Sequence, residues 1–274
     1  MAISRSQLAK ELEPGLNALF GMEYSRYENQ HAEIFDTETS DRAFEEEVML
    51  SGFGAAPTKS EGGSIAFDDA QEAYTSRYNH ETVALGFSIT EEAVEDNLYD
   101  RLSSRYTRAL ARAMAHTKQV KAAAILNNAF NSSFKGGDGK ELCATDHPLT
   151  NGGTFANEPS TAADLNETSL EDALISIAGF TDERGLIIAL KGQKLIIPRQ
   201  LQFVAERLMV SNLRVGTADN DTNAIRSMGL LPEGYVVNDY LTDTDAFFIK
   251  TDAPNGLKHF ERLAMSTNLS LIHI

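Results

Sequence analysis

The feature that most constrains this chain is a long stretch without glycine or proline, which runs from residue 91 to Gly136. Thr90 suits an N-cap, and acidic residues follow it where a helix dipole is positive. We predict one helix over residues 91–129, about 55–60 Å long; the alternative is two helices that break near Ala115–Lys118. Apolar side chains fall near one face of this helix: Val94, Leu98, Leu102, Tyr106, Leu110, Met114, Val120 and Ile125.

Residues 1–45, which precede it, are predicted to form a helical arm. Leucines and Phe20 recur there at three- and four-residue spacing, and Pro14-Gly15 interrupts the pattern. The aromatic side chains of Tyr24, Tyr27 and Phe35 follow. Such amphipathic side chains dock an arm onto a neighbouring molecule, or they pack against their own domain, and the sequence leaves both alternatives open.

Residues 46–89 change character, because SGFGAAPTKSEGGSIAFDDA is dense in glycine, serine, alanine and proline. We predict two strands joined by a loop, with a mobile tip at Thr58–Gly63. A loop of this length and low apolar content indicates a contact with a partner. The alternating stretch TVALGFSIT predicts a further strand over residues 82–90. The candidate assembly residues of the loop are Gly52, Phe53, Gly54, Lys59, Gly62, Gly63 and Phe67.

Helical and alternating patterns are mixed after residue 133. A helix is predicted over about residues 168–180, with Thr168 or Ser169 as its cap. The stretch KGQKLIIP predicts a short buried strand, and RQLQFVAERLMVS predicts a helix that begins just after Pro198. Three strands are predicted in GYVVNDYL, DAFFIKTD and GLKHFERLAM. This order favours an α+β fold over a regular βαβ succession.

The composition is acidic, with 24 Lys and Arg against 40 Asp and Glu and a formal net charge of -16. This balance argues against a protein that wraps nucleic acid, although it is compatible with a wall that encloses DNA without gripping it. The first residues lack the apolar run of a secretory signal, and no segment approaches the roughly 18–20 apolar residues of a membrane helix. We therefore expect a soluble, cytoplasmically made protein without a membrane partner.

The stretch GGDGKELCATDHP holds the only cysteine, Cys143, close to Asp146 and His147. A thiol site needs a cysteine whose pKa is lowered beside a histidine, and neighbouring loop positions do not ensure this. One cysteine and six scattered histidines also make a poor zinc ligand set. We interpret the segment as a loop with a buried thiol and a histidine bonded to backbone. No catalytic residue, metal or cofactor is expected, and a cysteine-dependent hydrolase remains the alternative from another class.

The order of arm, extended loop, long helix, mixed domain and returning strands resembles tailed-phage major capsid proteins with the Hong Kong 97-type fold. The local sequence is most similar to that of the Mu-like (gpT-like) major head subunit group. The matching stretches cover most of residues 18–265 and include ALFGMEYSRYENQHAEIF, FEEEVMLSGFGAAPTKSEGGSIAFDDA, HETVALGFSITEEAVEDNLYD, DGKELCATDHPLTNGG, LIIPRQLQFVAERLM, DTNAIRSMG and DAPNGLKHFERLAM. In these capsids the segment that corresponds to Asp146–Pro148 is a loop without catalytic function.

The resemblance implies a structural subunit of a tailed bacteriophage or prophage head. Hexamers and pentamers of the chain would form an icosahedral shell that encloses DNA, with the loop of residues 50–82 over the next subunit. A portal, a scaffold or maturation protease and other head proteins would be partners, and the virion would be assembled in the host bacterial cytoplasm. An encapsulin-like nanocompartment shell of the same fold is the alternative. The crosslinking known for one branch of this fold is not carried over to Lys59.

The resemblance also divides the chain. An arm is expected over residues 1–45, an extended loop over 46–89, a spine helix over 90–133, an axial domain over 134–234, and returning peripheral-domain strands over 235–268. The residues LSLIHI at 269–274 differ from the basic strand that these capsids usually have there. Our hypothesis is that residues 269–274 are encoded by adapter read-through on a truncated reading frame.

Overall fold

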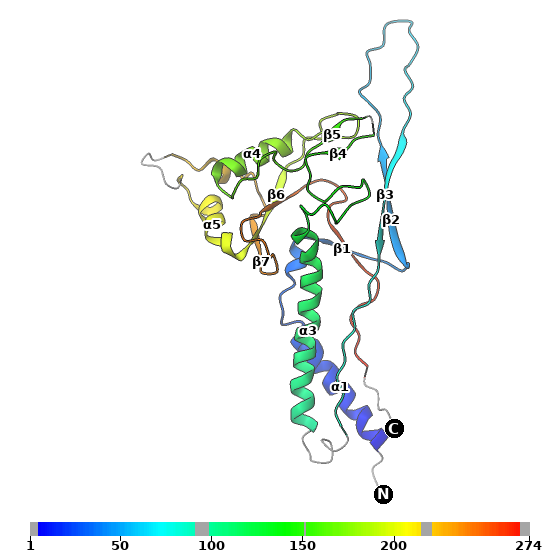
Figure 1. Ribbon diagram of the computed structural model, residues 1–274, viewed down its shortest axis with the longest axis vertical. Helices are drawn as coiled ribbons and strands as arrows, with labels where there is room; N and C mark the ends of the chain where they lie inside the picture. Colours follow the sequence, from blue (N-terminus) through cyan, green and yellow to red (C-terminus); the bar gives the residue numbers. More distant parts are fainter. Residues whose placement is uncertain (1–4, 91–98, 151, 215–220, 269–274) are drawn as a thin grey trace.

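The computed structural model describes residues 5–90, 99–150, 152–214 and 221–268. A long helix and a β-hairpin extend in opposite directions from a body of helices and short strands (Figure 1). The chain therefore mixes helices and strands without a regular βαβ succession, and the α+β prediction is confirmed at that level. Residues 269–274 and the expected start of the long helix at residues 91–98 lie outside the described residues.

The long helix, α3, spans Tyr99–Asn127 without a break. The alternative of two helices that separate near Ala115–Lys118 is therefore wrong, because no glycine or proline interrupts an alanine-rich turn there. The arm begins with α1 (Arg5–Tyr24), which lies beside α3 and is joined to it by an ion pair between Arg108 and Glu23 (Figure 1). The helix α1 continues through Pro14-Gly15, so the expected interruption is also wrong; one missing N–H has not broken the helix.

The predicted hairpin is confirmed. Strand β2 (Phe44–Ser51) pairs antiparallel with β3 (Gln71–Asn79), with a register irregularity between Val48 and Leu50. The expected strand over residues 82–90 is wrong, because this segment is extended but has no ladder partner among the described residues. The segment lies alongside α3 instead. An ion pair joins Glu81 to Lys121, and the rings of Phe87 and Tyr106 are in contact. Its apolar alternation thus faces a helix rather than a strand.

The body is built on a three-stranded sheet in the order β7-β6-β8. The predicted strand β6 (Gly192–Pro198) lies in the centre, parallel to β7 (Tyr235–Asn238) and antiparallel to β8 (Phe248–Thr251). The helices that complete the body are α4 (Glu167–Ala178), α5 (Gln202–Val210) and the short α6 (Ala224–Met228). A 3-10 turn, η2 (Arg199–Leu201), follows Pro198 directly and leads into α5 as predicted.

The predicted cap of α4 is wrong by a few residues. Asn166 is the N-cap, and its side chain accepts a hydrogen bond from the N–H of Ser169. The hydroxyl of Ser169 accepts one from the N–H of Asn166 in return, at 3.0 Å. Asparagine is as good a cap as serine or threonine, so the helix begins one position before the predicted start and includes both predicted cap residues.

Strand β6 separates two hydrophobic cores. Leu195 and Ile197 face a core formed with α4, α5 and α6, whereas Ile196 faces a second core formed with the arm and α3. This alternation follows from the two-residue period of a strand. The sheet also joins residues 192–198 to residues 235–251, so the boundary expected after residue 234 passes through one sheet.

The arm is tied to the body by a third small sheet. After the 3-10 turn η1 (Gln30–Glu33), strand β1 (Asp36–Thr39) pairs parallel with β9 (Lys258–Glu261). The remaining sheet consists of the two-residue strands β4 (His147–Pro148) and β5 (Thr154–Phe155). Strand prediction was therefore correct for GYVVNDYL, DAFFIKTD and GLKHFERLAM, although β9 pairs with the arm rather than with its neighbours in sequence.

Candidate assembly surface

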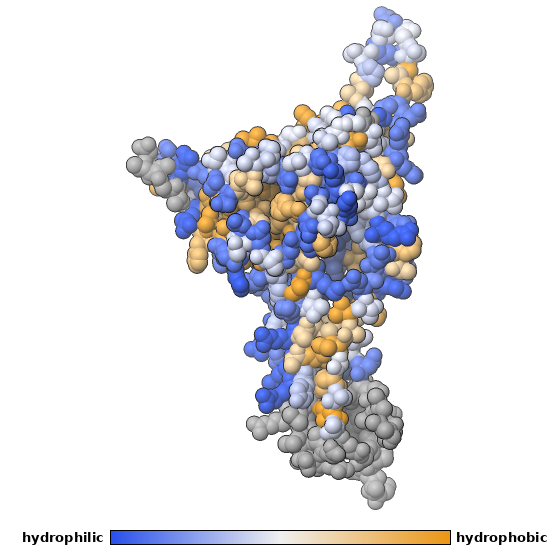
Figure 2. Space-filling view, viewed as in Figure 1, coloured by the Kyte–Doolittle hydropathy of each residue, from blue (hydrophilic) through white to orange (hydrophobic). Residues whose placement is uncertain are grey.

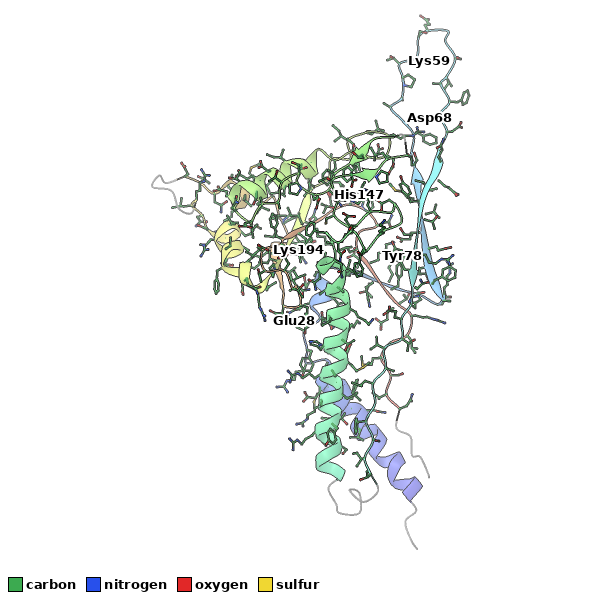
Figure 3. The ribbon with its side chains drawn as sticks, viewed as in Figure 1. Glu28, Lys59, Asp68, Tyr78, His147 and Lys194 are labelled. Carbon is green, nitrogen blue, oxygen red and sulfur yellow. The ribbon has the colours of Figure 1, made fainter. Side chains whose placement is uncertain are left out.

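The loop between β2 and β3, residues 52–70, projects beyond the body and carries exposed apolar side chains (Figure 1). Phe53 is 60% exposed, Ile65 68% and Phe67 94%. Figure 2 shows apolar residues on this loop beside polar ones, and Figure 3 places Lys59 far out along it. A large ring that is almost fully exposed gains nothing from the fold of its own chain, so this loop is a candidate contact surface.

Glycines at the tip permit a tight turn. The N–H of Gly63 donates to the carbonyl of Ser60 at 3.0 Å, and Gly62 has a φ of 77°, which other residues rarely adopt. The structure therefore brings Gly62 and Gly63 together in a turn at the predicted tip. It separates them from Gly52 and Gly54, which lie where the loop leaves the hairpin.

Arg184 holds the two sides of the loop together at its base, which we call the neck (Gly52, Gly54, Asp68 and Asp69). Its Nε donates to the carbonyl of Gly52 at 2.9 Å, and its Nη2 donates to the carbonyl of Asp69 at 2.7 Å. Nη2 also lies 3.2 Å from Oδ1 of Asp68. One guanidinium thus binds the outgoing and the returning chain, and its planar geometry fixes both.

Asp68 adds a direct bond across the neck. Its Oδ2 accepts a hydrogen bond from the N–H of Gly54 at 2.8 Å. That bond, followed by the charge of Arg184, holds the pKa of the Asp68 carboxyl below its usual value. Asp68 therefore stays ionised at neutral pH, and both of its neck contacts are charge-assisted.

A turn between α4 and β6 presents Arg184 to the neck. Oδ1 of Asp182 accepts the N–H groups of Arg184 and Leu186, at 2.9 and 2.8 Å. Gly185 has a φ of 83°, and Thr181 pairs with Ile187 across the turn. The sequence TDERG indicates such a turn, but it carries no sign of a partner 116 positions away, which is why sequence reasoning missed Arg184.

The hairpin itself is docked on its own body. The hydroxyl of Tyr74 donates to the carbonyl of Pro148 at 2.9 Å, and Lys258 Nζ lies 2.6 Å from a carboxylate oxygen of Glu47. The loop at Gly137 lies so close to β3 that a Cβ there would be 3.0 Å from the carbonyl oxygen of Thr75. These contacts fix the hairpin, so the direction of the projecting loop is set by the subunit.

The three aromatic residues of the arm have different surroundings. Phe35 is only 7% exposed and packs in the core with Ile34 and Leu126, which is the local-packing alternative. Tyr24 stacks on Phe20 within α1, with ring centroids 6.0 Å apart. Tyr27 is exposed. Of these three aromatic residues, Tyr27 is thus the most exposed, at 37%.

The segment around Cys143 is not a thiol active site. Burial, together with the charge of Glu158, raises the pKa of the Cys143 thiol to about 12, whereas a nucleophilic cysteine needs a lowered pKa. His147 Nδ1 lies 2.6 Å from Oδ2 of Asp138, and its Nε2 lies 3.3 Å from Oδ1 of Asn157. The ring therefore bonds side chains, and the predicted bond to backbone is wrong. Asp146 instead pairs with Lys140.

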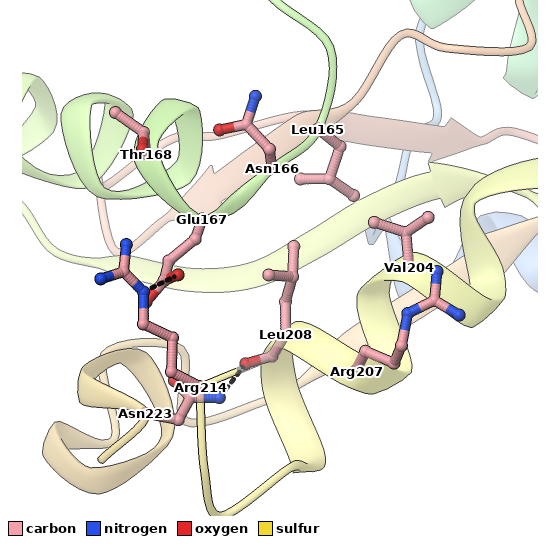
Figure 4. A pocket seen from close by; sticks show the side chains of 9 residues that line it. All are labelled: Leu165, Asn166, Glu167, Thr168, Val204, Arg207, Leu208, Arg214 and Asn223. Carbon is pink, nitrogen blue, oxygen red and sulfur yellow. Dashed lines mark hydrogen bonds and ion pairs between the residues drawn. The ribbon is translucent and has the colours of Figure 1, made fainter. Parts of the chain in front are cut away.

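A pocket of about 320 Å³ lies between the N-terminus of α4 and α5 (Figure 4). Leu165, Val204 and Leu208 supply its apolar lining. Arg207 lies beside Val204 on α5, whereas Arg214 lies across the pocket beside Glu167 (Figure 4). Arg214 Nε lies 2.6 Å from a carboxylate oxygen of Glu167, which closes the polar side. The lining contains no histidine, cysteine or serine, and its one carboxylate, that of Glu167, is paired with Arg214, so the pocket has the composition of a packing groove rather than of a catalytic centre. Its remaining lining residues are Asn166, Thr168 and Asn223.

The residues that the structure describes contain no group of three or more His, Cys, Asp or Glu side chains placed to hold a metal ion. None of their helices is both long enough and apolar enough to cross a membrane.

Comparison with known proteins points to one group. Residues 72–267, well over half of the chain, match the family described as Phage capsid protein. No curated protein matches the sequence. Among solved structures, the bacteriophage JBD30 capsid is similar with a TM-score of 0.60 at 12% identity, over 79% of this chain and 92% of that chain. The JBD30 procapsid is similar with a TM-score of 0.57 at 14% identity, over 87% and 100%.

A third similar structure is the JBD30 capsid decorated with minor capsid protein trimers. Its TM-score is 0.56 at 14% identity, over 76% of this chain and 89% of that chain. At these identities the structural likeness concerns the fold alone.

Proposed function

Because this chain belongs to the phage capsid protein family and is a structural, major capsid protein of a phage, we propose that it builds the head shell through its projecting loop. In this proposal the loop of residues 52–70 lies on the next subunit and joins neighbours around the shell. The single observation that carries it is the combination of a fixed neck and a nearly fully exposed Phe67.

The finer assignment is to the Hong Kong 97-type architecture and to its Mu-like group. The order of elements supports it: an arm, a hairpin with a long loop, the helix α3, a mixed body and returning strands. In this scheme residues 134–234 form most of the axial domain, and α3 with the strands of residues 235–268 forms the peripheral domain. Because β6 shares a sheet with β7 and β8, we propose that the two domains move as one unit.

The partners proposed are chiefly other copies of this chain, in hexamers and pentamers. The net charge of -16 suits a wall that faces packaged DNA without tight binding, because clustered cations are what hold nucleic acid. A portal, a scaffold or maturation protease, and a minor capsid protein such as the one on the JBD30 capsid are further candidate partners. Assembly would take place in the cytoplasm of the bacterial host.

The experiment that tests this function compares shell formation of Phe67→Ser and Phe67→Leu with that of the parent. Phe67→Ser removes apolar surface that only a neighbour can bury, so we expect shells to be lost while the melting temperature of the subunit is unchanged. Phe67→Leu keeps an apolar side chain and should retain shells. Electron microscopy and size-exclusion chromatography give the readout. Normal shells from Phe67→Ser would contradict the proposal.

A further inference from the structure

Two histidines from distant parts of the chain meet where the arm, α3 and β9 join. His31 lies in η1 and is only 4% exposed. Its ring and the ring of His259, which lies in β9, form an edge contact with centroids 5.3 Å apart. The two residues are thus neighbours at the point where the arm changes from a helix into strand β1.

Gln119 of α3 binds His31 at two atoms. Its Oε1 accepts the backbone N–H of His31 at 3.0 Å. Its Nε2 donates to the carbonyl of Glu28 at 3.3 Å and lies 3.0 Å from Nδ1 of His31. An amide nitrogen only donates, so Nδ1 of His31 accepts and carries no proton. Rotating the amide by half a turn would lose both backbone bonds, which means that this network holds His31 in its neutral form.

His259 has no compensating contact. Its Nδ1 is buried and has no hydrogen-bond partner among the described residues. The groups that face the pair are Lys118 from α3 and Glu261 from β9. Burial, followed by the charge of Lys118, lowers the pKa of His31 and of His259. Glu261 opposes this effect for both, but it is the weaker influence. The contact with Gln119 would raise the pKa of His31 only if Nδ1 donated to it, and an amide nitrogen does not accept.

We propose that His31, Gln119 and His259 form an acid-sensitive latch that holds residues 28–39 of the arm against α3 and β9. With the arm in place both histidines are neutral. Protonation of His31 places an N–H against the amide nitrogen of Gln119, and protonation of His259 adds a second cation beside Lys118. Either event favours a state in which η1 has left α3 and the rings are in water.

The sign of the effect follows from the direction of the shifts. Both pKa values are lower with the arm in place than the ordinary histidine value of about 6.5. The contribution of the latch to stability is therefore complete above pH 6.5 and is lost as the pH falls below it. For each histidine the equilibrium for release rises by up to about tenfold per pH unit in that range.

The latch also affects the strand pair and the core that adjoin η1. Strand β1 follows it directly and pairs with β9, and Ile34 and Phe35 between them pack in the core with Leu126. Release of η1 would loosen the β1–β9 pair and expose this apolar surface. The latch is independent of the proposed function, because it operates within one subunit.

Hydrogen exchange of the unassembled subunit at pH 7.5 and pH 5.5, corrected for intrinsic rates, tests the latch. In the parent we expect protection of peptides within residues 28–39 to fall several-fold at pH 5.5, by up to about tenfold for each histidine, while peptides of β6 stay unchanged. In the double variant His31→Asn with His259→Phe we expect a change below twofold. Asparagine keeps an acceptor near the position of Nδ1, and phenylalanine keeps the ring contact.

His116→Gln is the control. His116 is an exposed histidine on α3, the helix that carries Gln119, so this variant should lose protection at pH 5.5 as the parent does. If the double variant is unfolded at pH 7.5, the single variant His259→Phe replaces it, with an expected loss smaller than that of the parent. The proposal is overturned if the parent shows no local loss of protection, or if the folded variant loses as much as the parent.

Discussion

At the scale of single residues, the direction of the projecting loop depends on a side chain outside it. Arg184 binds Gly52 and Asp69 from a turn that follows α4, and Asp68 binds Gly54 across the same neck. None of these four partners is a large apolar residue. The loop is thus positioned by hydrogen bonds and charge, and its apolar side chains remain available for other contacts.

Replacing Arg184 with glutamine should loosen the neck without unfolding the subunit. The lost bonds lie at the surface, so we expect a cost of about 1 kcal/mol in unfolding free energy. Hydrogen exchange within residues 52–70 should rise, and shell yield should fall. Arg42→Gln is the matched control, since the side chain of Arg42 is 73% exposed and lies 3.7 Å from a carboxylate oxygen of Glu45. Unchanged exchange in Arg184→Gln would show that the neck is held by other contacts.

The Cys143 thiol should be unreactive in the folded protein. With a pKa of about 12, almost none of it is ionised at pH 8, and only the thiolate reacts with iodoacetamide. We expect labelling at least a hundredfold slower than in denaturant, where an ordinary cysteine has a pKa of about 8.5. Mass spectrometry over time gives both rates. Equal rates in the two states would contradict the assigned burial.

At the scale of elements, α3 and the strand β6 show what the sequence could predict. The absence of glycine and proline predicted a long helix, of which the structure describes Tyr99–Asn127, and KGQKLIIP predicted a short buried strand, which is β6. Local periodicity carries this information because it depends on residues a few positions apart. The contacts of Arg184 with Asp68, and of Gln119 with His31, join residues 116 and 88 positions apart, and no local pattern encodes them.

The segment over residues 82–90 shows a second limit of prediction from the sequence. Its alternation is that of a strand, but the neighbour that it contacts through Phe87 is Tyr106 of a helix. Alternation indicates which side chains share a face, whereas a strand also requires a partner for its backbone. The fold class and the hairpin were therefore predictable, and the element that lies beside each extended segment was not.

A proline within α3 should destabilise the subunit strongly. Ala113→Pro removes one backbone hydrogen bond and places a ring against the preceding turn, at a cost of about 3 kcal/mol or more. Ala113→Gly changes the same position without that clash and should cost about 1 kcal/mol. Chemical denaturation gives both values, and shell assembly should fail for the proline variant. Equal stabilities would mean that α3 is already interrupted at this point.

At the scale of the whole molecule, β6 makes the two cores interdependent. Ile196 belongs to the core of the arm and α3, and Ile197 belongs to the core of α4 and α5. If β6 leaves one core, its backbone hydrogen bonds to β7 and β8 break, and its side chains leave the other core as well. The subunit should therefore unfold as one unit, although its long helix and hairpin give it an elongated outline (Figure 1).

Ile196→Ala and Ile197→Ala should each destabilise both cores. Removing a fully buried isoleucine side chain costs about 2–5 kcal/mol. We expect each variant to lower the midpoint of urea unfolding equally for a fluorescent probe on α3 and for one on α5. A variant in which only one probe shifts would show that the cores unfold separately and that β6 does not couple them.

The pairing of β1 with β9 also determines when the arm can join the body during synthesis of the chain. Asp36 pairs with Lys258, so the partner of β1 is made more than 200 residues later. At a synthesis rate of about 5–20 residues per second, β1 waits on the ribosome for roughly 10–40 s before it can pair. A chain on which β9 has not yet been made thus lacks the junction between its arm and its body. Under the proposed function, such a chain does not have the subunit geometry for joining a neighbour, so synthesis of β9 precedes polymerisation.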